Sequence, residues 1–319
     1  MWLSSGMVRT VVAWALVAVC AAWLVVRAFG LERGYPMVPV LAFTPLAVLG
    51  AVVAAVAAFA LRRRAAGLAG LVIAVGLAGL VAPRGLGGPT QAEGGTAGRL
   101  RVLTANLYQQ PRAARSLAAI VRREKPDVVS VQELTPAMAR ELGALLPHRV
   151  IDPRPGGFGT GLYSRTPLDR RDAPRGQKVT VAEVSTRGGG VASPQVWSVH
   201  PLVPSRESHM AEWQADLRAL PPATDETVRI LAGDFNATLD HAELRRVIDR
   251  GYVDAAAVVG AGLHPTWPAG RRIPPPVTVD HVLADERAGV RSVHVLALAG
   301  SDHRAVLAEL ALPESPTGR

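Results

Sequence analysis

The sequence predicts an α/β domain that follows an apolar, membrane-spanning segment. The chain has 319 residues, is 49% hydrophobic and has a mean hydropathy of +0.21. The apolar excess lies before residue 83, whereas strand-like and helix-like patterns alternate from residue 99 onward. The roughly 220 residues after that point are enough for one buried core.

The charge and cysteine content narrow the possible classes. Residues 1–98 hold seven arginines and two acidic residues, whereas residues 99–319 hold 28 Lys+Arg and 24 Asp+Glu. The basic charge is therefore partly a membrane-topology signal and is not strong evidence for nucleic-acid binding. Cys20 is the single cysteine, so the chain has neither an internal disulfide nor a cysteine-based metal site.

Three apolar stretches predict transmembrane helices, at about 10–29, 37–61 and 66–82. A bilayer core of about 30 Å requires about 20 apolar residues, so the third stretch is at the lower limit. A signal peptide is the alternative for the first stretch, but it lacks a clean small-x-small exit and two more apolar runs follow. We therefore predict a multi-pass segment over residues 1–82 whose partner is the lipid bilayer.

The short loops predict how this segment is oriented. Arginines at 62–64 lie between the second and third spans, and clustered arginines in a short loop favour the cytoplasm. The N-terminus is then cytoplasmic and the domain extracytoplasmic, in the cell membrane. Arg27 and Arg33 flank the first external loop and weigh against this orientation, although Glu32 partly offsets them.

The rest of the chain divides into a linker, a domain and a tail. Residues 83–98, rich in Gly and Pro, are expected to form a flexible linker, and residues 314–319 a tail. Within the domain at 99–313, the strand patterns lie at 100–109, 127–134, 158–168, 194–204, 228–238, 278–285 and 290–310. Helix patterns lie at 113–126, 136–147 and 208–222.

Polar residues end several of these strands: Asn106, Glu133, His200, Asp234 with Asn236, Asp280, and Asp302 with His303. One such ending is typical of a turn, since Asp and Asn are common turn residues. Six in one domain instead indicate a rim where polar groups converge on a pocket. Because side chains alternate along a strand, we expect Asp234 and Asn236 to leave their strand on one face.

The residue types at this rim indicate a class of chemistry. An oxygen-rich set without cysteine suits a hard ion such as Mg²⁺ or Mn²⁺ better than zinc. Histidines near such an ion can donate to anionic oxygens. Hydrolysis of a phosphoester needs this combination of charge neutralisation, positioning and a polarised water.

Seven short blocks follow one another in the domain: TANLY, VQEL, GTGLYSRTPL, WSVHPL, AGDFNA, TVDHVL and GSDHRAV. In this order they closely resemble the endonuclease/exonuclease/phosphatase (DNase I-like) superfamily over residues 99–313. The resemblance implies a four-layer αββα sandwich, so the fold class predicted for the chain is this α/β sandwich preceded by three transmembrane helices. It also implies phosphoester hydrolysis that depends on Mg²⁺ or Mn²⁺.

The resemblance further implies roles for eight residues. The metal-side residues are Glu133 as principal ligand, Asn106 beside it, and Asp302 as a second carboxylate. The catalytic residues are Asp234 for the attacking water, Asn236 and His200 at the phosphate, His303 for the transition state, and Asp280 to orient His303. A helix-capping or surface carboxylate remains the alternative for Glu133, and a satisfied core histidine for His200.

Other residues carry weaker expectations. Pocket-wall positions are Asp254, Thr266 and Trp267, whereas no role is assigned to Tyr163, Arg165, Arg271 and Arg272. Surface or packing positions are expected for His148, His209, His241, His294 and Trp213. The block SVHPL departs from the family pattern, because Pro201 follows the histidine and leaves the fit of the substrate open.

Three functions follow, from different classes. The first is an extracytoplasmic, membrane-anchored phosphatase or phosphodiesterase that acts on a lipid-linked or small phosphate or pyrophosphate of the cell envelope. It draws on a likeness in layout to anchored proteins of high-GC actinobacteria, including the VanJ-type teicoplanin-resistance group, and on the count of 33 Arg against two Lys. The second is an anchored extracellular nuclease, less favoured because no basic patch interleaved with aromatics is visible. The third is a non-catalytic sensor that kept the fold.

Overall fold

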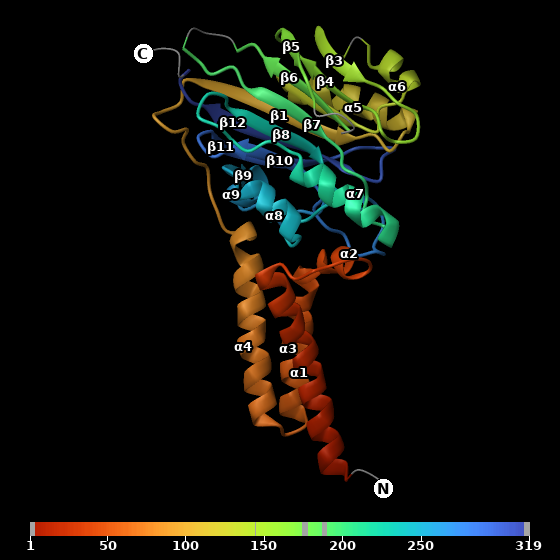
Figure 1. The fold of residues 1–319 in the computed structure, drawn as a ribbon, viewed down its shortest axis with the longest axis vertical. Coiled ribbons are helices and arrows are strands. Elements are labelled where there is room, and N and C mark those ends of the chain that lie inside the picture. Colours follow the sequence, from red (N-terminus) through yellow and green to blue (C-terminus); the bar gives the residue numbers. More distant parts are fainter. Residues whose placement is uncertain (1–3, 144, 174–177, 187–189, 316–319) are drawn as a thin grey trace. The chain divides into compact units, whose positions relative to one another are not determined.

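The chain forms two compact units in the computed structural model, which describes residues 4–143, 145–173, 178–186 and 190–315. Unit 1 comprises Met1–Pro83 with Leu239–Ala242, and unit 2 comprises Arg84–Thr238 with Glu243–Arg319. Unit 1 holds the apolar helices, and unit 2 holds both β-sheets (Figure 1).

Unit 1 consists of α1 (Ser5–Phe29), α2 (Met37–Leu41), α3 (Thr44–Ala60) and α4 (Arg64–Val81). Small residues allow α1, α3 and α4 to pack closely, since Ala13, Ala58 and Ala66 share one buried cluster. Two helices of the described chain, Ser5–Phe29 and Arg64–Gly85, are each long and apolar enough to cross a bilayer. Thr44–Ala60 is a shorter apolar helix.

The prediction of one continuous transmembrane helix at 37–61 is wrong, because this segment forms two separate helices. The chain turns between α2 and α3, and the Thr44 hydroxyl donates to the Leu41 carbonyl at 2.7 Å. Pro45 at the start of α3 has no amide hydrogen to give to the preceding turn, so it favours a new helix start here. Over the residues that the structure describes, there are therefore two candidate spans and one shorter apolar helix, where three spans were expected.

The Gly- and Pro-rich segment before the domain also differs from its predicted flexibility. Residues 82–85 form the 3₁₀ helix η1 (Ala82–Gly85), and later residues run along unit 2. Backbone amides of Gly88, Thr90 and Glu93 donate to carbonyls of Val258, Val290 and Arg287 at 2.7–3.0 Å. These bonds order a segment whose composition alone predicts a mobile tether.

Unit 2 is built on two six-stranded sheets. The first sheet has the order β11-β12-β1-β2-β4-β3, with β1 Gly98–Asn106, β2 Val128–Gln132, β3 His148–Asp152, β4 Thr160–Ser164, β11 Gly289–Ala297 and β12 Arg304–Leu312. The second has the order β5-β6-β7-β8-β10-β9, with β5 Leu168–Arg171, β6 Val179–Val184, β7 Gln195–Val199, β8 Arg229–Asp234, β9 Tyr252–Asp254 and β10 Asp280–Asp285. Each sheet contains one parallel pair, β1 with β2 and β7 with β8.

The two sheets pack face to face, and helices lie outside them (Figure 1). The inter-sheet core contains Val102, Val128, Ile230, Val282 and Val306. On the first sheet's outer face lie α5 (Pro111–Glu124) and α6 (Pro136–Glu141), and near the second sheet lie α7 (Glu207–Arg218), α8 (Ala242–Ile248) and α9 (Ala255–Val258). The predicted αββα sandwich is therefore confirmed as a two-sheet α/β sandwich.

Strand alternation directs the polar strand ends into the space between the sheets. Ile230 and Ala232 face the inter-sheet core, so Asp234 at the end of β8 faces the same way. Val282 and Ala284 place Asp280 on that face of β10 by the same alternation. The candidate site therefore lies at one end of the inter-sheet core.

Candidate active site

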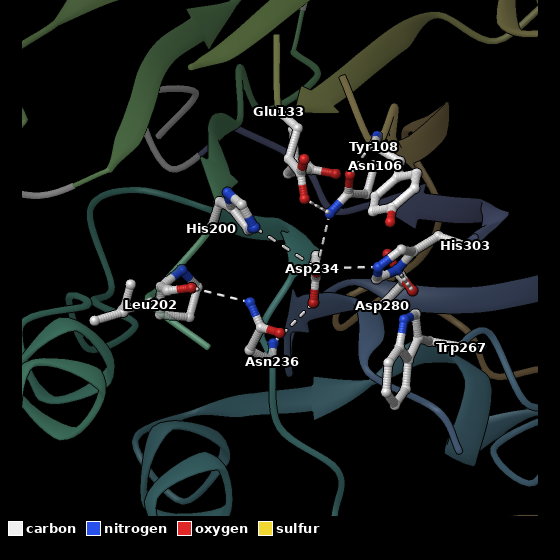
Figure 2. Close-up of polar contacts among 12 residues, drawn as sticks. Asn106, Tyr108, Glu133, His200, Leu202, Asp234, Asn236, Trp267, Asp280 and His303 are labelled. Carbon is white, nitrogen blue, oxygen red and sulfur yellow. Dashed lines mark hydrogen bonds and ion pairs between the residues drawn. The ribbon is translucent and has the colours of Figure 1, made fainter. Parts of the chain in front are cut away.

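Asp234 is the centre of the site and is 1% exposed. Its Oδ2 accepts a hydrogen bond from Asn106 Nδ2 at 2.9 Å and lies 3.7 Å from His200 Nε2 and 3.6 Å from His303 Nε2. Figure 2 shows these side chains pointing at the carboxylate from different elements. Gly233 lets β8 approach β7 here, because a Cβ on that residue would lie 2.0 Å from the Val199 carbonyl oxygen.

Asp234 and Asn236 form a turn as well as a site. Asp234 Oδ1 accepts from the Asn236 amide at 2.8 Å, and Asn236 has a left-handed backbone with φ of 47°. The strand thus ends at Asp234, and Asn236 does not continue its alternation. Asn236 Nδ2 instead donates to the Pro201 carbonyl at 3.0 Å, which ties the turn to the loop after β7.

Glu133 and Asp234 lie on either side of the Asn106 amide. Asn106 Nδ2 also contacts Glu133 Oε1 at 3.2 Å, and Gln109 Nε2 donates to Glu133 Oε2 at 3.1 Å. Glu133 has a left-handed φ of 54°, which is uncommon for a residue with a side chain and turns it out of the direction of β2. One amide group therefore bridges two carboxylates that come from different sheets.

His303 and Asp280 form a buried pair. His303 Nδ1 lies 2.9 Å from Asp280 Oδ2, and Thr266 Oγ1 accepts the amides of Asp280 and Val279 at 3.1 and 3.0 Å. Burial alone would lower the pKa of His303, but the carboxylates of Asp280 and Asp234 outweigh it and raise this pKa to about 10. His303 is therefore a cation at neutral pH, with both ring nitrogens able to donate.

His200 differs from a satisfied core histidine. It is 8% exposed, lines the pocket, and its Nδ1 is buried without a hydrogen-bond partner in the described part of the chain. The loop that follows is fixed by Asp216 on α7, whose Oδ2 accepts from the Leu202 amide at 3.0 Å. Its Nε2 lies 3.7 Å from Asp234 Oδ2, beyond hydrogen-bond distance, so the imidazole can still form a hydrogen bond to a ligand.

The site opens into a pocket of about 300 Å³. Its polar end contains Glu133, His200, Asp234, Asn236 and His303, and its other walls contain Tyr108, Gln109, Gly156, Gly157, Phe158, Lys178, Pro201, Leu202, Val203, Trp267 and Asp302. The Lys178 ammonium lies 4.9 Å from the Phe158 ring centroid, and its side chain is 12% exposed. The pocket therefore combines an acidic and histidine-rich end with aromatic and aliphatic walls and one lysine.

All eight residues singled out from the sequence fall in one connected cluster, while their roles remain predictions. Asp302 lies on the His303 side, where its Oδ2 accepts from Trp267 Nε1 at 3.1 Å and its Oδ1 is 3.9 Å from His303 Nε2. Tyr163 is buried in the core beneath α5, and Arg165 donates to the Pro126 carbonyl, so both have packing roles. The residues Arg271 and Arg272 are exposed.

Several pocket residues had no usable sequence signal. Tyr108 and Gln109 follow β1 with left-handed φ values of 50° and 52°. Neither residue type predicts this conformation. Phe158 and Lys178 reach the pocket only through long-range strand placement. His281 does not line the pocket, and its place beside Asp280 in the TVDHVL block gives no sign of a separate role.

The donor set fits a hard divalent cation. The carboxylates of Asp234 and Asp280 lie within 4.8 Å of each other beside His303, and Glu133 adds a partly exposed carboxylate at the pocket. Buried oxygens of Asp280 and Asp302 also lack hydrogen-bond partners among the described residues. Carboxylate oxygens that remain unsatisfied are the ligands that Mg²⁺ and Mn²⁺ prefer.

The fold is a DNase I-like two-sheet sandwich in which several polar strand ends gather at one pocket. The chain belongs to the Endonuclease/Exonuclease/phosphatase family, whose sequence profile matches residues 103–303. Enzymes of this family hydrolyse phosphoester bonds and depend on divalent metal ions. No curated protein sequence matches the chain.

Solved structures share the fold at low sequence identity. A D. rerio TDP2 humanized by 14 mutations superposes with a TM-score of 0.55 at 18% identity, over 66% of this chain and 98% of that one. An endonuclease/exonuclease/phosphatase from Beutenbergia cavernae superposes with a TM-score of 0.53 at 21% identity, over 69% of this chain and 73% of that one. An AP endonuclease from Archaeoglobus fulgidus superposes with a TM-score of 0.52 at 14% identity, over 66% of this chain and 98% of that one.

Proposed function

We propose that the protein is a membrane-anchored, extracytoplasmic phosphoester hydrolase that depends on Mg²⁺ or Mn²⁺. The observation that carries the proposal is the buried Asp234 carboxylate, which lines a pocket and is surrounded by His200, Asn106 and His303. Such a carboxylate can orient a water molecule and accept its proton. The neighbouring donors supply the electrostatic stabilisation that a phosphoryl group needs.

Each residue then has a defined task. Asp234 holds and deprotonates the attacking water, while Asn236 Nδ2 and His200 Nε2 contact the phosphoryl oxygens. His303, kept cationic by Asp280, stabilises the charge that develops in the transition state. Glu133 and Asn106 would hold the metal ion, with Asp302 as a further carboxylate. When bound, the ion neutralises phosphate charge and polarises the reacting groups.

The pocket walls support a small or lipid-linked substrate. Tyr108, Phe158 and Val203 are 42%, 42% and 45% exposed, so apolar surface stands next to the acidic end. An apolar group on the substrate can lie there while its phosphate meets Asp234. A lipid-linked phosphate or pyrophosphate of the cell envelope has both parts, and the likeness in layout to VanJ-type envelope proteins points the same way.

Membrane anchoring rests on the candidate spans in unit 1. The helices Ser5–Phe29 and Arg64–Gly85 are long and apolar enough to cross a bilayer, and only 17% and 33% of their most apolar stretches are buried. Exposed apolar helix surface of this kind is stable in lipid. The arginines between α3 and α4 favour a cytoplasmic loop and hence an external unit 2.

A nuclease is the second candidate. D. rerio TDP2 has been solved with a single strand DNA product, and it shares the fold with a TM-score of 0.54 at 18% identity. The small charge excess of residues 99–319 favours this candidate less, since nucleic-acid binding usually uses a basic patch.

A substrate panel tests the proposal with the full-length protein in lipid nanodiscs. Phosphate or nucleotide release is measured with Mg²⁺ or Mn²⁺ on a polyprenyl pyrophosphate, a phospholipid, an inositol phosphate, and single- and double-stranded DNA. Asp234→Ala and His303→Ala are the inactive controls. Metal-dependent turnover of the polyprenyl substrate supports the envelope function, turnover of DNA alone supports the nuclease, and no turnover of any substrate contradicts both.

A further inference from the structure

A second buried histidine–aspartate pair lies behind the site and has no task in the reaction described above. His281 follows Asp280 on β10, so its side chain leaves the strand on the opposite face. It is 1% exposed, with Nδ1 2.7 Å from Asp254 Oδ2 and Nε2 2.9 Å from the Ala237 carbonyl oxygen. The rings of Phe235 and His281 pack in a T-shaped arrangement, with their centroids 5.7 Å apart and their planes at 81°.

The partners of His281 define its hydrogen bonds. A carbonyl oxygen only accepts, so Nε2 must carry a proton and donate to Ala237. Asp254 Oδ1 accepts from the Ala257 amide at 2.7 Å, which fixes this carboxylate as the cap of α9. Burial by itself lowers the pKa of His281, but the Asp254 carboxylate outweighs it and the pKa is raised.

This pair is connected to the turn that presents the reacting groups. Ala237 follows Asn236, and both Ala237 and Phe235 are fully buried. The turn is held at its start by the Phe235 amide, which donates to the Val279 carbonyl at 2.9 Å. His281 holds its end. Asn236, with its left-handed φ of 47°, lies between these two attachments and is also bonded to Asp234 and Pro201.

We propose that His281, oriented by Asp254, is a positioning residue that fixes the 234–237 turn and thereby aims Asn236 Nδ2 and the Asp234 carboxylate at the substrate phosphate. The proposal rests on the proposed function for its catalytic consequence, but the fixing of the turn is independent of it. Loss of the Nε2 donor leaves the buried Ala237 carbonyl without a partner among the described contacts, which favours a shift of the turn. A misplacement of about 1 Å at a reacting group costs on the order of 100-fold in rate.

Matched variants of the full-length protein separate positioning from packing. His281→Phe keeps an aromatic ring against Phe235 but removes both nitrogens. Asp254→Asn keeps the cap, since the introduced amide oxygen accepts from Ala257 while its nitrogen donates to a neutral His281 Nδ1. His294→Phe makes the same change at an exposed histidine on β11 and serves as the control.

Two measurements decide the proposal. Hydrogen exchange should show about 10-fold or more loss of protection at the Phe235 and Asn236 amides in His281→Phe, with Asp254→Asn and His294→Phe unchanged. The kcat on a substrate turned over by the wild type should fall about 10- to 100-fold in His281→Phe alone, while Mn²⁺ affinity is kept. Unchanged protection overturns the proposal whether or not the protein is active. Lost protection with wild-type kcat overturns its catalytic part. A wild type without activity contradicts the proposed function, and exchange then decides the positioning alone.

Discussion

Asn106 and Asp234 lie 128 positions apart in the sequence, yet Asn106 Nδ2 donates to Asp234 Oδ2 at 2.9 Å. Asn106 ends β1 of one sheet and Asp234 ends β8 of the other, so this bond joins the sheets where the inter-sheet core ends. The same amide reaches Glu133 at 3.2 Å. The bond thus links the predicted metal side of the site to the predicted base.

Metal dependence should reside mainly in Glu133. Its carboxylate is at the pocket, partly exposed, and bonded only by amides of Asn106 and Gln109 among the described contacts. Glu133→Gln should weaken Mn²⁺ binding about 10-fold or more, measured by titration with EPR detection of free Mn²⁺. Chelation with EDTA should abolish turnover, and added Mg²⁺ or Mn²⁺ should restore it. Glu141→Gln on α6 is the control, and equal affinities in the two variants would exclude Glu133 as a ligand.

The His303–Asp280 pair should give a pH-dependent contribution to stability. The pKa of His303 is raised to about 10 in the folded chain from an ordinary value of 6.5. The folded state therefore binds the proton more tightly, so the stabilisation is complete below pH 6.5 and is lost as the pH rises to about 10. The gap in Tm between the wild type and His303→Gln, measured in EDTA, should shrink across this window. A gap that stays constant or grows with pH would show that the charge of His303 is not involved.

Lys178 should contribute to substrate affinity more than to chemistry. Its ammonium lines the pocket beside Phe158 and pairs with Glu212 at 2.7 Å, away from Asp234's own hydrogen bonds. Lys178→Met should raise KM for a pyrophosphate substrate about 3- to 10-fold, since about 1 kcal/mol of charge-assisted contact is lost, and leave kcat within about twofold. Steady-state kinetics against Lys125→Met, a change at the other lysine of the chain, provide the comparison. A fall in kcat with unchanged KM would assign Lys178 to the chemical step instead.

The membrane orientation can be measured with single cysteines. In a Cys20→Ala background, Ser185→Cys places a thiol on an exposed position of unit 2, and Ala65→Cys places one at the start of α4. A membrane-impermeant maleimide added to intact cells should label the first position, and the second only after permeabilisation. Labelling in the opposite pattern would place unit 2 in the cytoplasm and remove the envelope substrate from reach.

Much of the fold could be predicted because its central strands are buried and periodic. The alternation in β1, β8 and β10 places Asn106, Asp234 and Asp280 on the face between the sheets, as the strand-end pattern indicated. The two edge strands of the second sheet gave no such signal. β5 reads LDRR and is mostly exposed, and β9 has three residues, so neither shows an apolar pattern.

The details of the site depend on long-range geometry that local patterns do not contain. The left-handed conformation of Glu133 arises at a residue type that usually avoids it, whereas Asn236 is of a type that adopts it more readily, and both conformations decide where the side chain points. Likewise the pairing of His281 with Asp254 joins β10 to β9 and α9 across 27 positions. The helix predicted at 136–147 ends at Glu141, because a turn at Leu142 interrupts it.

The central claim is that Asp234 activates water for metal-dependent hydrolysis of a phosphoester or of the phosphoanhydride bond of a pyrophosphate, and Asp234→Asn tests it most directly. The introduced amide offers one acceptor where the carboxylate offers two, to the Asn236 amide and to Asn106, so a stability loss of about 1–2 kcal/mol is expected with the fold kept. Mn²⁺-dependent phosphate release from a polyprenyl pyrophosphate by the full-length protein should fall about 100- to 10,000-fold. Equal turnover by wild type and Asp234→Asn would contradict the claim, since it would show that the carboxylate at the centre of the site does not take part in the reaction.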